Sequence, residues 1–422
     1  MEGFADGRRV PPDFVVGMGS LTFGLVAGFA VTAMPFLLSK AGVSVDQIAA
    51  VSATAMSPTF FTFLLTPIVD VCFTRRTYAF GLAAATAASL GSALFVLSSS
   101  RLPLFTALAF IAMLCVVLQN NAVGGWMTEF VPDERRGRVG GWQNAANLGG
   151  GAAGSMLVMS LARSLTIETV AVLMTALVLA SSMVLLWFPR PAMPKFGLTE
   201  MFGGTFRSVI RTSRQPNVLT GFLLFLLPAA SVAAVNLFSG LGKDFSASPE
   251  RVIQVTGAGV ALFSSIGALL GGYLADRADR KILYLSGGTL AGLCSISLAV
   301  LPHTQTTFIA GVLAYNGIAG ICYAAFSALS LELAGIGNPT AATQLGLFAA
   351  ATNGAIVYMT WSDGQGYRLF GVRGLFLVDG FAGLLASAGL LIFLRLRERK
   401  KPIAPEFPGE PREQELAEVE PT

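Results

Sequence analysis

The sequence predicts an all-α polytopic membrane protein with twelve transmembrane helices in two six-helix halves. Hydrophobic residues make up 54% of the 422 residues and charged residues only 12%, a balance foreign to soluble globular proteins. The apolar residues gather in runs of about twenty, the length that a helix needs to cross a hydrocarbon core about 30 Å thick. The runs fall into two sets of six, separated by the longest polar interval of the chain.

Twelve apolar runs are candidate membrane spans. In order they cover 14–38, 47–71, 77–97, 104–128, 139–161 and 169–188, then 218–241, 252–275, 282–301, 307–333, 341–361 and 375–394. They divide the chain into an N-terminal bundle (1–188), a cytoplasmic linker (189–217), a C-terminal bundle (218–395) and a tail (396–422). The linker has the pattern of a basic amphipathic helix. The tail is rich in Pro and Glu, which predicts disorder.

The basic residues predict the orientation. With the N-terminus in the cytoplasm, 21 of the 28 Lys and Arg residues fall in inside segments and 7 fall outside. This bias predicts that both termini are cytoplasmic, in the inner (plasma) membrane. The basic loops are then topology signals, so no nucleic-acid partner is expected, while the lipid bilayer is.

Acidic residues at span ends indicate an internal repeat. Asp70 ends span 2 and Asp276 ends span 8, 206 positions apart. Glu129 and Glu332 end spans 4 and 10, 203 positions apart. Two markers at nearly one offset predict a parallel repeat of about 200 residues.

The stretch "GGYLADRADRK" carries a family resemblance. It is similar to the loop 2–3 signature of the major facilitator superfamily, G-x-x-x-D-R-x-x-R-[RK], at Gly272, Asp276, Arg277, Arg280 and Lys281. The first-half copy is degenerate, because Thr66 replaces the glycine and Val71 follows Asp70. The resemblance covers nearly the whole chain and implies the fold of that superfamily.

Charges at the cytoplasmic ends of the helices are candidates for a latch between the halves. A carboxylate there can accept hydrogen bonds from the N-terminus of a neighbouring helix and pair with arginines, and the cluster can release when the halves rock. The alternative is that these charges only anchor the topology. The candidate residues are Asp70, Arg76, Glu129, Arg136, Asp276, Arg277, Arg280 and Glu332.

A narrower resemblance is to the AmpG-type muropeptide permeases and the wider peptide–acetyl-CoA transporter group. It rests on "TPIVD" (Thr66, Pro67 and Asp70) and on "TEFVPDERRG". The matching positions of the second motif are Glu129, Pro132, Glu134, Arg136 and Gly137. It implies proton-coupled import of a muropeptide-like solute, although those permeases often have more than twelve spans.

Amide side chains inside the spans are candidate substrate ligands. The superfamily resemblance implies a site near the midplane between the halves, where polar residues are costly and often functional. Uncharged amides suit a polar solute such as a sugar, peptide or siderophore, and the alternative is that they bridge packed helices. The candidates are Gln119, Asn120, Asn121, Asn144, Asn147, Asn236, Asn316 and Asn353.

Asp379 is the one acid that the predicted spans place clearly inside the membrane. It is a candidate proton-coupling site, with pairing to Arg373 or capping of a neighbouring helix as alternatives. The four cysteines form no CxxC pair, and no cluster predicts an enzyme, a cofactor or a metal site.

We therefore expect a monomeric secondary transporter that imports a small polar solute with protons. An efflux carrier and a non-transporting receptor are the alternatives. Drug exporters of the superfamily usually carry a Gly-Pro pair in span 5, where this chain has "NLGGGAAGSML", and this favours import.

Overall fold

The computed structural model describes residues 10–70, 73–189, 215–336, 338 and 340–399. The predicted amphipathic helix of the linker and most of the predicted tail lie outside these residues. The described chain is helical and contains no strand, as the sequence predicts.

Nine helices within the described residues are long and apolar enough to cross a membrane. They are Asp13–Lys40, Arg75–Phe95, Leu102–Phe130, Asp133–Ser164, Ile167–Trp187, Pro249–Ala275, Arg280–Val300, Gln305–Ala334 and Ala341–Phe393. The other predicted crossings are present in another form. Spans 2 and 7 are broken into short helices, and spans 11 and 12 run on as one element with a kink. The twelve-helix fold is thereby confirmed.

The first half contains six crossings. The first is α1 (Asp13–Gly17), η1 (Met18–Ser20), α2 (Leu21–Gly28), η2 (Phe29–Ala33) and α3 (Met34–Lys40). The second is α4 (Val45–Met56), α5 (Pro58–Phe61), η3 (Thr62–Leu64) and η4 (Thr66–Asp70). The others are α6 (Arg75–Phe95), α7 (Leu102–Phe130), α8 (Arg136–Ser164) and α9 (Ile167–Ser182) with η7 (Met183–Trp187); η5 (Ser99–Arg101) and η6 (Asp133–Arg135) lie in loops.

The second half repeats this order. Its first crossing is α11 (Pro216–Leu226), η8 (Pro228–Ala230), η9 (Ala233–Asn236), η10 (Phe238–Gly240) and η11 (Gly242–Phe245). Then follow α12 (Pro249–Gln254), η12 (Val255–Gly259) and α13 (Val260–Ala275), α14 (Arg280–Val300), α15 (Gln305–Ala334) and α16 (Ala341–Arg399). Local signals set several ends: Asp279 caps α14 by accepting from two backbone N–H groups at 2.9 Å, and α15 ends at Gly335 with a φ of 80°.

The end of span 11 differs from the prediction. The predicted span stops at residue 361, but α16 continues to a kink at Phe370 and Gly371, where φ is 64° at the glycine. Asp363 therefore lies inside a helix and is fully buried. The stretch "SDGQGYR" looks like a polar loop in sequence, yet the helix turns its acid inward. At its far end α16 reaches Arg399, past the predicted end of the bundle at 395.

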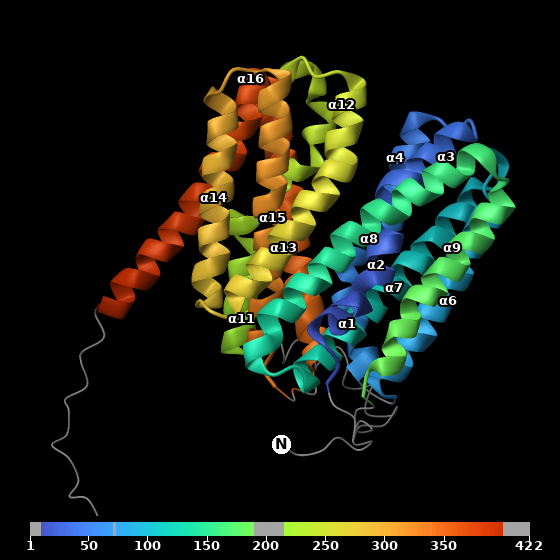
Figure 1. Ribbon diagram of the computed structural model, residues 1–422, viewed down its shortest axis with the longest axis horizontal. Helices are drawn as coiled ribbons and strands as arrows, with labels where there is room; N and C mark the ends of the chain where they lie inside the picture. The colour runs from blue at the N-terminus through green and yellow to red at the C-terminus, as the bar shows by residue number, and fades with distance from the viewer. Residues whose placement is uncertain (1–9, 71–72, 190–214, 337, 339, 400–422) are drawn as a thin grey trace, which may run out of the picture.

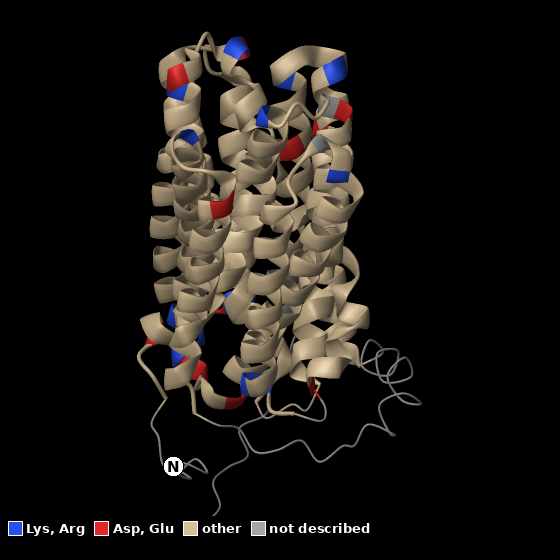
Figure 2. Cartoon of the chain, turned by 90° about the vertical axis from the view of Figure 1, so that its right-hand side faces the viewer, with Lys and Arg blue, Asp and Glu red and all other residues tan. Residues whose placement is uncertain are grey.

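Figure 1 shows the helices in two groups, one holding α2 to α9 and the other α11 to α16. Each group has its own large apolar core, one drawn from residues 26–178 and one from 218–376. A third, smaller core mixes Leu331 and Ala342 with first-half residues. Charged residues gather at the two ends of the molecule, with few between them (Figure 2).

The two halves meet closely where α8 packs on α13. Glycines form this contact: a Cβ on Gly272 would lie 2.5 Å from the Gly137 carbonyl oxygen and 2.7 Å from the Gly141 Cα. Small residues allow such close approach of membrane helices. The halves therefore touch backbone to backbone at this point.

We expect Gly272→Ala to lower the melting temperature of the detergent-solubilised protein, because the added methyl group collides with backbone that no rotamer change can move. The control is Gly389→Ala, since nothing lies within 4 Å of a Cβ at that helical position. Equal melting temperatures for the two variants would contradict the close contact.

Candidate functional site

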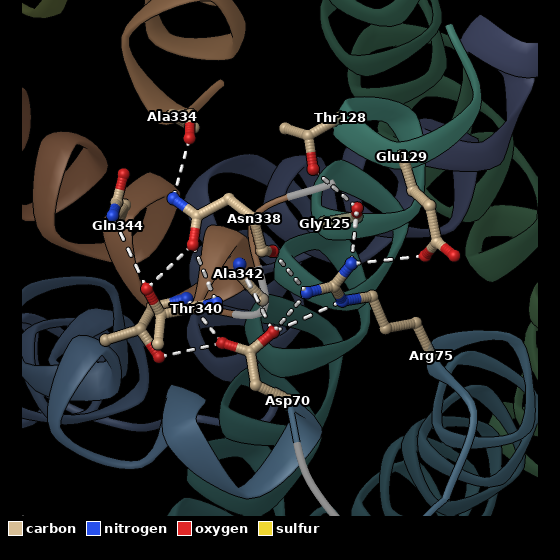
Figure 3. A network of polar contacts seen from close by, with 11 residues as sticks. Asp70, Arg75, Gly125, Thr128, Glu129, Ala334, Asn338, Thr340, Ala342 and Gln344 are labelled. Atoms are coloured by element: carbon tan, nitrogen blue, oxygen red, sulfur yellow. Dashed lines mark hydrogen bonds and ion pairs between the residues drawn. The ribbon is translucent and has the colours of Figure 1, made fainter. Parts of the chain in front are cut away.

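Asp70 binds the start of α16 from across the interface between the halves. Its carboxylate accepts hydrogen bonds from the Thr343 N–H at 3.0 Å, the Thr343 hydroxyl at 2.9 Å and the Ala342 N–H at 3.4 Å. Figure 3 shows the carboxylate of Asp70 beside Ala342. The side chain is only 4% exposed, so water screens these bonds little. Asp70 thus acts as a cap that the first half supplies to a helix of the second.

Arg75 extends this contact in three directions. It pairs with Asp70 at 2.9 Å and with Glu129 at 3.4 Å, and it donates to the Gly125 carbonyl at 3.0 Å. It also donates to the Asn338 carbonyl of the second half at 3.1 Å (Figure 3). One guanidinium therefore joins three segments.

Arg76, the latch candidate from this basic pair, has contacts other than Asp70. Arg76 donates to the Leu186 carbonyl at 3.2 Å and lies over the Phe80 ring. The two arginines open α6, and their directions around the helix differ by about 100°, so only one points at Asp70. The basic pair is visible in sequence, but its orientation is not.

Asp276 makes the matching contact in the opposite sense. Its carboxylate accepts from the Gly137 N–H at 2.6 Å and from the Arg138 N–H and Nε, both at 3.0 Å. It therefore caps α8 of the first half. The capped residues Gly137 and Ala342 are 205 positions apart, nearly the offset between the two aspartates. The helix macrodipole favours a carboxylate at both places.

Three further latch candidates surround Asp276. Arg136 is 1% exposed, donates to the Leu331 carbonyl of the second half at 3.0 Å and pairs with Asp133 at 2.8 Å. Arg280 pairs with Glu332 at 3.0 Å and donates to the Asp133 carbonyl across the interface. In the described part of the chain, the ion pairs between the halves all lie at this end of the molecule.

Arg277 does not join this network. Its guanidinium lies 3.5 Å from the centre of the Tyr273 ring, on the exposed side of α13. In the described part of the chain, Arg277 therefore contacts Tyr273 rather than the network. Arg75, Arg138 and Thr343 contact the two aspartates and were not among the sequence-based candidates.

Three of the candidate amides lie where helices of the two halves meet. Asn144 of α8 donates to the Tyr323 carbonyl at 3.1 Å and to the Ser327 hydroxyl at 2.8 Å, both on α15. Asn353 of α16 donates to the Thr59 carbonyl at 3.2 Å. Asn121 of α7 donates to the Thr66 hydroxyl at 3.2 Å and lies beside Gly346 of α16.

The other candidate amides have contacts inside one half. Gln119 reaches the Gly19 carbonyl at 3.4 Å, and Asn120 accepts from the Ser20 hydroxyl at 2.8 Å. Asn316 donates to its own helix, at the Val312 carbonyl, and Asn236 reaches Thr360 at 3.4 Å. Asn147 lies half-buried where α8 crosses Gly24. The structure therefore does not gather all eight residues into one site.

Asp379 lies in the core of the second half. It accepts a hydrogen bond of 2.8 Å from the Tyr315 hydroxyl and is 5% exposed. Arg373 is exposed, and in the described part of the chain no ion pair joins it to Asp379. The fully buried Asp363 is a second intramembrane acid, which the sequence-based spans placed in a loop.

Removing the charge of Asp276 should loosen the contact between the halves. A hydrogen bond to a charged group contributes about 1.5–3 kcal/mol, so even at the lower end of this range Asp276→Asn should open this end about tenfold more often. The reporter is Ser327→Cys in a chain without its native cysteines, because Ser327 lies under Asn144 of α8. A water-soluble thiol reagent should label it about tenfold faster in the variant.

The matched control for this measurement is Arg277→Gln, which alters the neighbouring charge outside the network. It should leave the labelling rate unchanged. Equal rates for Asp276→Asn and the parent would show that the cap does not hold the halves together.

Solved structures with the same architecture include transporters of sugars and organic anions. The proton:xylose symporter XylE, bound to 6-bromo-6-deoxy-D-glucose, has a TM-score of 0.65 and 16% identity; the match covers 90% of this chain and 95% of that chain. The E. coli fucose:proton symporter FucP has a TM-score of 0.66 and 13% identity, covering 91% and 98%. The human organic anion transporter MFSD10 has a TM-score of 0.64 and 16% identity, covering 90% and 99%.

The sequence itself gives a family match. Comparison with curated proteins yields no match. The family model described as Major Facilitator Superfamily matches residues 16–360 and, in a second alignment, 230–418. Together with the twelve-helix fold and the paired helix caps, this match shows that the chain belongs to the major facilitator superfamily.

Proposed function

We propose that this protein is a secondary active transporter that imports a small polar solute by alternating access, with protons as the coupling ion. It acts as a monomer in the inner (plasma) membrane, with both termini in the cytoplasm. Its moving bodies are the two bundles, 1–188 and 218–395, joined by the linker 189–217 and followed by the tail 396–422.

The paired caps of Asp70 and Asp276 carry this proposal. Each is a reversible polar contact between the halves, and both lie at the end where the basic loops gather. Water can replace these bonds when the halves separate, so the contact favours one state without locking it. The structure then corresponds to a state closed at the cytoplasmic end, and a rocking of the halves that separates the α8–α13 contact would open it.

The amides at the interface support a polar, uncharged recognition site. Asn121, Asn144 and Asn353 now bond protein groups across or beside the interface, and the same donors would become available to a solute when the halves part. Hydroxyl-rich and amide-rich solutes suit such donors. The solute class that we propose is muropeptide-like, and peptides, sugars and siderophores are chemically related alternatives.

Two resemblances support import over efflux. The motifs "TPIVD" and "TEFVPDERRG" resemble those of the AmpG-type permeases, and two of the similar structures are named as proton symporters of sugars. In addition, α8 is continuous from Arg136 to Ser164 and has no proline, whereas exporters of the superfamily usually carry a Gly-Pro pair there.

The direct test is uptake of labelled anhydro-muropeptide by vesicles that contain the protein, with and without a proton uncoupler. We expect concentrative uptake that the uncoupler abolishes. Empty vesicles are the control, and a panel of a sugar, a dipeptide and a siderophore measures selectivity.

Failure of every solute in the panel, with protein shown to be folded in the vesicles, would overturn the import proposal. Uptake that persists in the presence of the uncoupler would support import but contradict proton coupling. Binding without flux would favour the receptor alternative.

A further inference from the structure

Two buried acids share one depth in the second half. Asp363 stands about two helical turns before the kink of α16 and Asp379 about two turns after it, so each lies about 10–12 Å from the turn. The two arms of α16 touch at Gly366 and Gly374, which places them side by side. Folding back at the kink therefore brings the two carboxyl groups near each other.

The polar surroundings of the two acids differ, because Asp379 accepts a hydrogen bond from Tyr315 and one from the backbone at Ala234. Asp363 is fully buried, and neither of its carboxyl oxygens has a hydrogen-bond partner. In the described part of the chain, no Lys, Arg or His pairs with either acid. The carboxyl groups interact electrostatically with each other and with Tyr315 of α15, and Cys294 of α14 is the other titratable neighbour.

The helix of the seventh crossing is broken next to Asp379. After α11 the backbone turns extended at Leu227, and Val232 has a left-handed φ of 45°, which is rare for a β-branched residue. A small cavity beside the break is lined by Ser231, Val232, Tyr315 and Asp379. Irregular backbone is tolerated at membrane depth where it lines a cavity, and such breaks hold coupling cations in other transporter folds.

We propose that Asp363 and Asp379 form one binding site for a single monovalent cation, a proton or Na⁺, in the core of the second half. The cation neutralises the buried pair, since two carboxylates at close range in an apolar core strongly disfavour full ionisation without one. Tyr315 holds Asp379 in place, and the break between α11 and η9 supplies the path and further oxygen atoms.

This proposal deepens the proposed transport function, because the bound cation would be the coupling ion. In this proposal Asp363 and Asp379 are both ligands of the cation. A purely structural role for either acid predicts something different: removing one would leave the ionic behaviour of the other unchanged.

The first test measures cation binding by purified protein without any solute. Infrared difference spectra record the carboxylic-acid band against pH, and the melting temperature is compared in NaCl and choline chloride. If the cation is a proton, Asp363→Asn should remove or shift the pH-dependent band of Asp379, and Asp379→Asn that of Asp363. If it is Na⁺, both variants should lose a sodium-dependent rise in melting temperature.

Controls separate this site from general effects. Asp244→Asn removes an acid at the outer end of the same half, where Asp244 accepts from Tyr367 at 3.1 Å, and should change neither readout. Tyr315→Phe keeps the packing and removes only the hydroxyl, so it should move the pH midpoint or the sodium response. If an Asn variant misfolds, Tyr315→Phe still tests the proposal.

Transport gives an independent arm. The variants Asp363→Asn and Asp379→Asn should lose concentrative uptake. They should still let the solute move down its own concentration gradient. Altered cation binding with no transport of any solute would sink the transport proposal alone. The cation site is overturned if each Asn variant leaves the other acid's band and the sodium response unchanged.

Discussion

The structure depends on one interaction made twice, the hydrogen bonding of a buried carboxylate to the N-terminus of a helix in the other half. Asp70 caps α16 and Asp276 caps α8, and the capped residues recur at almost the spacing of the aspartates. A helix start carries unsatisfied N–H groups that must find acceptors at the membrane edge. Each half supplies these acceptors to a helix of the other half. The hydrogen bonds that a helix start needs therefore also hold the two bundles together.

The glycine contact between α8 and α13 explains why this tie is geometrically possible. Gly137 lies next to Gly272 in backbone contact, and Asp276 follows one turn later. A larger residue at either glycine would hold the helix start away from the carboxylate. Hydrogen bonds and an ion pair contribute to the contact between the halves at this point, and these exchange readily with water. Such a contact suits bodies that must separate and rejoin.

The fold could be predicted from the sequence because its signals are long and repeated. Runs of about twenty apolar residues and acids at one offset are read without side-chain geometry. The partners of Asp70 could not be chosen in this way, because Arg75 and Arg76 differ only in their direction around a helix. Asp363 was missed for a similar reason. Hydropathy averages over a window, and a polar stretch with one inward acid resembles a loop.

The functional roles of the latch residues, the amides and Asp379 stay predictions, yet α16 connects several of them physically. Asp70 holds Ala342 and Thr343 at the start of α16, and Asp363 lies about 30 Å further along the same helix, just before the kink. Asn353 lies between them and contacts the first half. A rigid helix moves as a unit, so a change of charge at Asp363 that altered how α16 packs would also move its capped start. The proposed cation site and the Asp70 contact therefore lie on a single helix, and no other element is needed to connect them.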